Sequence, residues 1–278
     1  MPALPSIILV HGAWHTPDNY AGYTAALRAA GFFVHCPRLP SCDASRDIQG
    51  TFADDVRTVR ELASRLVEAG ERILMVMHSY GGAVGTDAVQ GLAFPYGSTV
   101  GKEGEERAGD GSGGKVGGVV HLLYLCAYIL LPGTCVWDIV REAGFEGVFH
   151  QYIETAEGDG SLFPLDPALM FFGGDENVPQ EVIDEAMKTL VRFPMSCLTT
   201  PTTGDAWREI PSTYVLTQKD YGVPRVYQDI MLAKVKEEGV DLRTEDFDTC
   251  HSIFISREGE MVELAVEAAS DKRNVSLV

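Results

Sequence analysis

Residues 72–92 read RILMVMHSYGGAVGTDAVQGL, and this stretch decides the fold. Its first part, Arg72–Met77, is a short continuous apolar run, which is typical of a central strand covered on both faces. Residues 78–82, HSYGG, come next, and their two glycines allow a tight turn. Tyr80–Leu92 has the spacing of an amphipathic helix. A buried strand that turns directly into a helix is the building unit of a parallel α/β sheet.

The same alternation continues on both sides of this unit. The expected strands are Ser6–Val10, Phe32–Cys36, Arg72–Met77, Gly118–Leu125, Ser212–Thr217 and Leu242–Asp246. The expected helices are Asp18–Ala30, Phe52–Ala69, Tyr80–Leu92, Pro224–Glu238 and Arg257–Ser270. Three of these helices are followed by a glycine that would stop them, at Gly31, Gly70 and Gly239. We therefore expect the α/β fold class, with a mainly parallel six-stranded sheet, right-handed crossovers and helices on both faces.

Two segments depart from this alternation of strands and helices. Residues 97–118 are rich in Gly, Glu and Lys without apolar periodicity, and we expect a flexible surface loop there. Residues 131–209 are too long for a single crossover, contain a helical pattern at Pro179–Leu190 and are rich in aromatic residues. We interpret them as a helical cap subdomain inserted after the fourth strand, although aromatic residues are also what an enlarged core would contain. The α/β core would then comprise residues 1–130 and 210–278.

Composition and charge restrict the partners. The chain has 278 residues, with 22 Lys and Arg against 40 Asp and Glu, so its formal net charge is −18. Such an acidic surface repels phosphate backbones and anionic lipids, so we expect no nucleic acid and no membrane as partner, and neutral rather than multiply anionic substrates. The first residues lack the features of a secretory signal, and the six cysteines form no C-x-x-C pair, which together favour a cytoplasmic protein with reduced thiols. A homodimer is left open.

The turn at Ser79 is the most specific chemical signal. A serine between a buried strand and a helix has the context of a nucleophile elbow, in which the turn exposes the hydroxyl at the carboxyl end of the sheet. Gly81 allows close approach of the backbone, and the helix N-terminus directs N–H groups towards developing negative charge. The alternative is an ordinary helix N-cap, a frequent use of serine.

The loop after the first strand, His11-Gly12-Ala13-Trp14-His15, leaves the sheet at the same edge. An acyl-transfer site needs two N–H donors for its oxyanion, and we assign them to Ala13 and Tyr80. His11 and His15 stand four residues apart, but the loop is not helical and no third ligand is evident, so we expect no metal site.

A serine nucleophile also needs a base and an orienting acid. Of the seven histidines, His251 follows the last expected strand and precedes the final helix, which returns it to the edge where Ser79 lies. Asp220 follows the fifth strand at the same edge and is the expected acid, with Asp246 and Asp248 as competitors close to His251 in the sequence.

These residues resemble the α/β-hydrolase superfamily, and within it the branch of hydroxynitrile lyases and plant methylesterases with its fungal and bacterial relatives. The stretches that carry the resemblance are residues 7–15, HSYGG at 78–82, YVLTQKDYGVP at 214–224 with Gln228 and Met231 beyond it, and DTCHS at 248–252. The order Ser79, Asp220, His251 is that of the superfamily. The resemblance implies these three as nucleophile, acid and base, Ala13 and Tyr80 as oxyanion donors, no cofactor, and a small, mostly apolar pocket under the cap.

Three positions depart from the family pattern. Met77 stands where the elbow usually has its first glycine, so a bulky side chain must find room between strand and helix. The lyases of this branch rely on a Lys directly after the base and a Thr in the first loop, where this chain has Ser252 and Gly12. Without that cation, stabilisation of a cyanide anion is disfavoured.

The expected function is therefore that of a serine hydrolase, an esterase with a catalytic triad and an oxyanion hole. It would cleave a carboxylic ester, thioester or lactone of a small apolar or aromatic molecule through an acyl-enzyme. Trp14, Tyr128, Trp137 and Phe172 are the expected substrate-binding residues. Two alternatives stay open: a carbon–carbon lyase, hydroxynitrile lyase-like or retro-aldol, that uses the same triad, and a small-ligand receptor without turnover.

Overall fold

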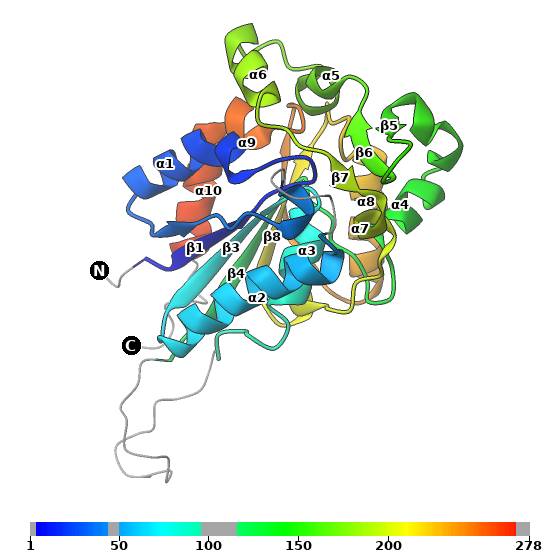
Figure 1. The fold of residues 1–278 in the computed structure, drawn as a ribbon. Helices are drawn as coiled ribbons and strands as arrows, with labels where there is room; N and C mark the ends of the chain where they lie inside the picture. The colour runs from blue at the N-terminus through cyan, green and yellow to red at the C-terminus, as the bar shows by residue number, and fades with distance from the viewer. Residues whose placement is uncertain (1–3, 44–49, 96–115, 271–278) are drawn as a thin grey trace, which may run out of the picture.

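The computed structural model describes residues 4–43, 50–95 and 116–270. Its centre is a six-stranded sheet in the order β2-β1-β3-β4-β8-β9, in which every pair of neighbours is parallel (Figure 1). The strands are β1 Ser6–Val10, β2 Val34–His35, β3 Arg72–His78, β4 Gly118–Leu125, β8 Ser212–Thr217 and β9 Arg243–Phe247. The predicted fold class is confirmed.

Helices cover both faces of this sheet (Figure 1). Successive side chains of a strand point to opposite faces, so Ile7 and Leu9 pack in one buried cluster while Ile8 and Val10 pack in the other. The helices on the first face are α1 Ala21–Ala29, α9 Ile253–Ser256 and α10 Glu258–Ser270. Those on the second face are α2 Phe52–Glu68, α3 Gly81–Ala88 and α8 Arg225–Glu237.

The ends of several elements differ from the prediction. β2 has two residues instead of the five in Phe32–Cys36, because it lies at the edge of the sheet and pairs on one side only. The helix predicted to reach Leu92 ends at Ala88, and Gly91 behind it has a left-handed φ of 72°. The helix predicted from Asp18 begins as a 3-10 turn at Pro17–Tyr20 before α1 starts.

The segment expected as a cap contains strands as well as helices. Its α-helices are α4 Val136–Glu142, α5 Pro167–Phe172, α6 Gln180–Met187 and α7 Met195–Thr199, with 3-10 turns at Glu146–Gln151 and Ala206–Arg208. Its strands β5 Ile153–Thr155, β6 Ser161–Pro164 and β7 Phe193–Pro194 form a small antiparallel sheet that the sequence did not predict. Strands of two to four residues are too short to give a readable alternation. The segment lies beyond the carboxyl ends of the parallel strands (Figure 1).

Three further expectations can be compared with the structure. Most of the loop expected at 97–118 lies outside the described residues, and β4 begins at Gly118, the last position of that range. All six cysteines lie in the described ranges, and none of them forms a disulfide. In these ranges no helix combines the length and the apolar character needed to cross a bilayer.

Candidate active site

Ser79 lies in a strained turn between β3 and α3. Its φ of 54° is in the left-handed region, which costs a residue with a Cβ about 1–3 kcal/mol and marks a turn held by its surroundings. The Ser79 N–H donates to the Leu125 carbonyl over 3.3 Å, and the Ser79 carbonyl accepts from the Tyr128 N–H over 2.9 Å. A Cβ at Gly81 would lie 2.3 Å from the carbonyl oxygen of Val10, so only glycine permits this approach. This is the geometry of a nucleophile elbow.

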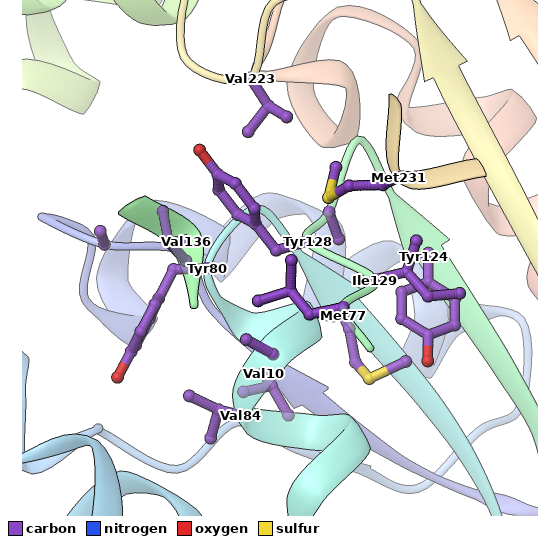
Figure 2. Packing of buried hydrophobic residues seen from close by; sticks show 14 of the residues in the cluster. Val10, Met77, Tyr80, Val84, Tyr124, Tyr128, Ile129, Val136, Val223 and Met231 are labelled. Carbon is purple, nitrogen blue, oxygen red and sulfur yellow. The ribbon is translucent and has the colours of Figure 1, made fainter. Parts of the chain in front are cut away.

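The side chain of Met77 occupies the space that a side chain at Gly85, one turn into α3, would fill. Met77 is fully buried, and a Cβ built on Gly85 would lie 2.4 Å from its Sδ and 2.9 Å from its Cγ. Figure 2 shows Met77 between Val10 and Tyr124, its register partners on the flanking strands β1 and β4. The missing side chain at Gly85 therefore compensates for the missing first glycine of the elbow, and Ser79 keeps its left-handed conformation.

His251 and Asp220 form a buried pair. The Nδ1–H of His251 donates to Oδ2 of Asp220 over 2.8 Å, which leaves the lone pair of Nε2 free to accept a proton. The ring of His78, the residue before Ser79, lies 4.5 Å from the His251 ring between centroids. A hydrogen bond between the Ser79 hydroxyl and His251 is not among those recorded for the described residues. Such contacts commonly tighten only in the complex with substrate.

The loop after β8 fixes Asp220. Oδ1 accepts the N–H groups of Gly222 and Val223 over 2.8 and 2.6 Å, and Oδ2 accepts the Thr217 hydroxyl over 2.7 Å. Gln228 in turn holds the loop, since its side-chain amide bonds Thr217 and the carbonyl of Val223. These donors leave the carboxylate one orientation, towards His251.

The two competing carboxylates do not reach the histidine. Asp246 accepts from Arg225 over 2.8 Å, and Asp248 pairs with Lys219 over 3.0 Å, in both cases on partly exposed side chains. Asp220 is therefore the carboxylate that the fold brings to His251.

A second hydrogen-bonded chain ties the first loop to the base. The Gly12 N–H donates to the Tyr20 hydroxyl over 3.0 Å, and this hydroxyl donates to Nδ1 of His78 over 2.6 Å. Nε2–H of His78 then donates to the carbonyl of His251 over 3.0 Å. Burial lowers the pKa of His78 well below its ordinary value, so the ring is neutral and bridges the two loops.

Most ligand atoms in two groups of metal-ligand residue types are hydrogen-bonded within the protein. Ligand atoms of His78, Cys126 and His251 lie within 4.8 Å of one another, but both ring nitrogens of His78 are hydrogen-bonded. Cys126 donates its S–H to the His251 carbonyl over 3.3 Å, and burial raises its pKa, which keeps it a thiol. His11 and His15 donate to the carbonyls of their own loop, and burial lowers their pKa values to about 4 and about 3.

The residues of the two expected oxyanion donors, Ala13 and Tyr80, line the same cavity. The N–H groups of Ala13 and Tyr80 donate to no acceptor recorded in the described part of the chain, and both residues line the cavity together with Ser79. Tyr80 is the N-cap of α3, where amides have no partner inside the helix.

The cavity above Ser79 has a volume of about 540 Å³. Trp14 and Tyr128, two of the four expected substrate-binding residues, line it. Phe172 lies in the core, and Trp137 stands behind the lining residue Phe149, with 4.9 Å between ring centroids. Spacing along the sequence could not tell these second-layer aromatics from lining ones.

Most of the cavity lining is apolar. Among the described residues that line it, only Asp166 and Asp220 carry a formal charge, and none is Lys, Arg or His. Asp166 is bound as the N-cap of α5, accepting from the Leu169 N–H over 2.9 Å. Four lining residues are large, apolar and about half exposed, and these form the rim of the cavity: Tyr152, Leu165, Leu169 and Tyr221.

Sequence reasoning missed three supporting residues: Tyr20, Thr217 and Asp55, whose carboxylate accepts the Tyr80 hydroxyl over 2.8 Å. Thr217 ends a strand three residues before Asp220, which is a signal that could have been used. Tyr20 and Asp55 act over separations of 58 and 25 residues, for which the sequence carries no local signal.

Comparison with known proteins gives the family. Residues 7–264 match the model of the Alpha/beta hydrolase family. The Alpha/beta hydrolase nvfD of Aspergillus novofumigatus is 29% identical over 241 residues, which cover 86% of each chain. Among solved structures, a pyrethroid hydrolase from Sphingobium faniae JZ-2 has a TM-score of 0.68 at 19% identity, over 96% of this chain and 98% of that one. Polyneuridine aldehyde esterase has a TM-score of 0.71 at 14% identity, over 95% and 98%. The chain belongs to the Alpha/beta hydrolase family.

Proposed function

We propose that this protein is a serine hydrolase that cleaves a neutral carboxylic ester, thioester or lactone through an acyl-enzyme. The observation that carries the proposal is the buried Asp220–His251 hydrogen bond beside an apolar cavity that Ser79 lines. A buried histidine with Nδ1–H donated to a carboxylate has its Nε2 free to act as a general base.

In the proposed first half-reaction, Nε2 of His251 takes the proton of the Ser79 hydroxyl while Oγ attacks the acyl carbon. The oxyanion that forms accepts hydrogen bonds from the N–H groups of Ala13 and Tyr80. Removal of one such donor typically costs on the order of 10²–10³ in turnover. Asp220 stabilises the imidazolium, which then gives its proton to the leaving oxygen or sulfur, and the acyl group stays on Ser79.

In the second half-reaction, His251 removes a proton from water, which attacks the acyl carbon of the ester on Ser79. The same two N–H groups hold the second oxyanion. When it collapses, the carboxylic acid leaves and the proton returns from His251 to Ser79. Every proton and bond is accounted for by these residues and water.

The cavity favours an apolar, uncharged substrate. A carboxylate or phosphate on the substrate would be buried without a cation among the described lining residues, which costs several kcal/mol. The half-exposed apolar rim adds surface for an aromatic or alkyl part. Two of the similar proteins, a pyrethroid hydrolase and polyneuridine aldehyde esterase, are hydrolases by name, which supports ester cleavage.

A panel of p-nitrophenyl acyl esters, lactones, thioesters and cyanohydrins tests the proposal. We expect turnover of acyl substrates and its loss in Ser79→Ala. The matched control is Ser252→Ala, since Ser252 is also buried and its hydroxyl has no hydrogen-bond partner among the described residues. Full activity in both variants removes Ser79 from the nucleophile role. Turnover of cyanohydrins alone favours the lyase, and tight binding without product favours the receptor.

A further inference from the structure

Asp55 is a buried carboxylate that the proposed mechanism does not use. It lies in the first turn of α2 and is 0% exposed. Its Oδ1 accepts the Ser41 N–H over 2.9 Å, and its Oδ2 accepts the Tyr80 hydroxyl over 2.8 Å. The second contact joins α2 to the residue whose N–H is the proposed oxyanion donor.

The surroundings of Asp55 contain no compensating cation among the described residues. The groups that face it are Asp54 on its own helix, Cys42 beside Ser41, Tyr80 at the start of α3 and Cys197 on α7. Burial raises the pKa of Asp55 to about 6, against the hydrogen bonds from Ser41 and Tyr80, which lower it. A buried carboxylate without a cation is costly to keep, which is why such groups concentrate at functional sites.

The side chain of Tyr80 has few ways to move while Asp55 holds it. Its ring packs edge-on against Phe193 of β7 and Phe52 of α2, with 4.9 and 6.2 Å between ring centroids. In Figure 2 its hydroxyl points away from Tyr128, and Asp55 bonds this end of the ring. The bond to Asp55 thus fixes the far end of a rigid side chain whose near end carries the oxyanion N–H.

We propose that Asp55 is a positioning residue for the oxyanion hole, and that the ionised carboxylate holds Tyr80 where its N–H can bind the oxyanion. This inference rests on the proposed function and adds a pH-dependent element to the same site. When Asp55 binds a proton, its hydrogen bond with the Tyr80 hydroxyl changes from a charge-assisted bond to a neutral one, which is roughly half as strong. The Tyr80 ring is then held less firmly.

The test is steady-state kinetics on a p-nitrophenyl ester from pH 4.5 to 8 with Asp55→Asn, Tyr80→Phe and the double variant. Asn imitates the protonated acid, and Phe keeps the ring but removes the hydroxyl. We expect kcat at pH 8 to fall roughly 10-fold in each single variant, a fraction of the loss of a whole donor. KM should stay within about twofold, since the oxyanion forms only in the transition state.

Two measurements, the pH profile of kcat and the kinetics of the double variant, distinguish a positioning role of Asp55 from a purely structural one. The loss of kcat that Asp55 causes below about pH 6 in the wild-type protein should disappear in Asp55→Asn. The double variant should be no slower than the slower single variant, because both changes break one contact. The control is Glu61→Gln, an exposed carboxylate further along α2 that is not among the groups facing Asp55, which should leave kcat and its pH profile unchanged.

The positioning role of Asp55 is refuted if kcat of Tyr80→Phe at pH 8 stays within about twofold of wild type. If Asp55→Asn does not fold, Tyr80→Phe alone serves as the test. The positioning role is also overturned if the losses appear in KM, or if the pH profile of kcat in Asp55→Asn is the same as in the wild-type protein. Ser79→Ala in the same assay separates the two proposals. Activity there refutes the serine mechanism, whereas its loss beside unaffected Asp55 and Tyr80 variants refutes only the positioning role.

Discussion

Replacement of Gly85 by alanine probes how the elbow tolerates Met77. In an open helical position, Gly→Ala stabilises a protein by up to about 1 kcal/mol through helix propensity. At Gly85 the new Cβ would lie 2.4 Å from Met77 Sδ and 2.9 Å from its Cγ, whereas ordinary contacts lie beyond 3.4 Å. Met77 is fully buried, so relief requires movement in the core, and overpacking of this kind costs about 1–3 kcal/mol. We therefore expect a net destabilisation of about 1–2 kcal/mol.

The assay is urea unfolding followed by tryptophan fluorescence, with Gly259→Ala as matched control. Gly259 lies in α10 and has no atom within 4 Å of a built Cβ, so its replacement should raise stability. The double variant Met77→Ala/Gly85→Ala should lose less than the sum of its single changes, because the methyl group added at position 85 fills part of the space that Met77 vacates. Stabilisation by Gly85→Ala equal to that by Gly259→Ala, or strict additivity, would refute the compensation between these two positions.

Three further outcomes are expected. Asp220→Asn sets an amide against the Nδ1–H of His251, and kcat should fall roughly 10³–10⁴-fold in steady-state assays; a loss below 10-fold contradicts the role of the acid. Gly222→Ala would place a methyl group 2.9 Å from His251 Nε2, and the displaced base should lower kcat on the order of 10²-fold with little change in melting temperature; an unaffected kcat shows that the ring is not held there. The raised pKa of Asp55 means that the native state binds this proton more tightly than the unfolded chain does, so Asp55 lowers stability as pH rises from about 4 to above 6, by about 3 kcal/mol. Urea unfolding of Asp55→Asn should therefore show its stability rising relative to wild type over this interval, whereas a constant difference contradicts the shift.

The sequence predicted the central strands and the order of the site residues. β4 and β8 have the predicted bounds because continuous apolar runs with flanking breaks leave few alternatives. Asp220 and His251 could be proposed from their places after strands, since parallel strands end at one edge. In the structure His251 is hydrogen-bonded to Asp220, whereas Asp246 pairs with Arg225.

Other features of the structure could not be predicted from the sequence, and the first two depend on packing between distant segments. The room for Met77 comes from Gly85 across a strand–helix contact, and no periodicity encodes the distance between those side chains. The contact of Asp55 with Tyr80 joins the starts of α2 and α3 through two residues that are 25 positions apart in the sequence. The small cap sheet was missed because its strands are shorter than the window in which alternation can be recognised.

The central claim is that Ser79 carries the acyl group during turnover. Rapid acid quenching of the protein during steady-state cleavage of an ester, followed by intact-mass measurement and peptide mapping, identifies it directly. We predict one acyl group per chain on the Ser79 peptide and none in Ser79→Ala. An acyl group on another side chain, or continued turnover in Ser79→Ala, would contradict the serine mechanism.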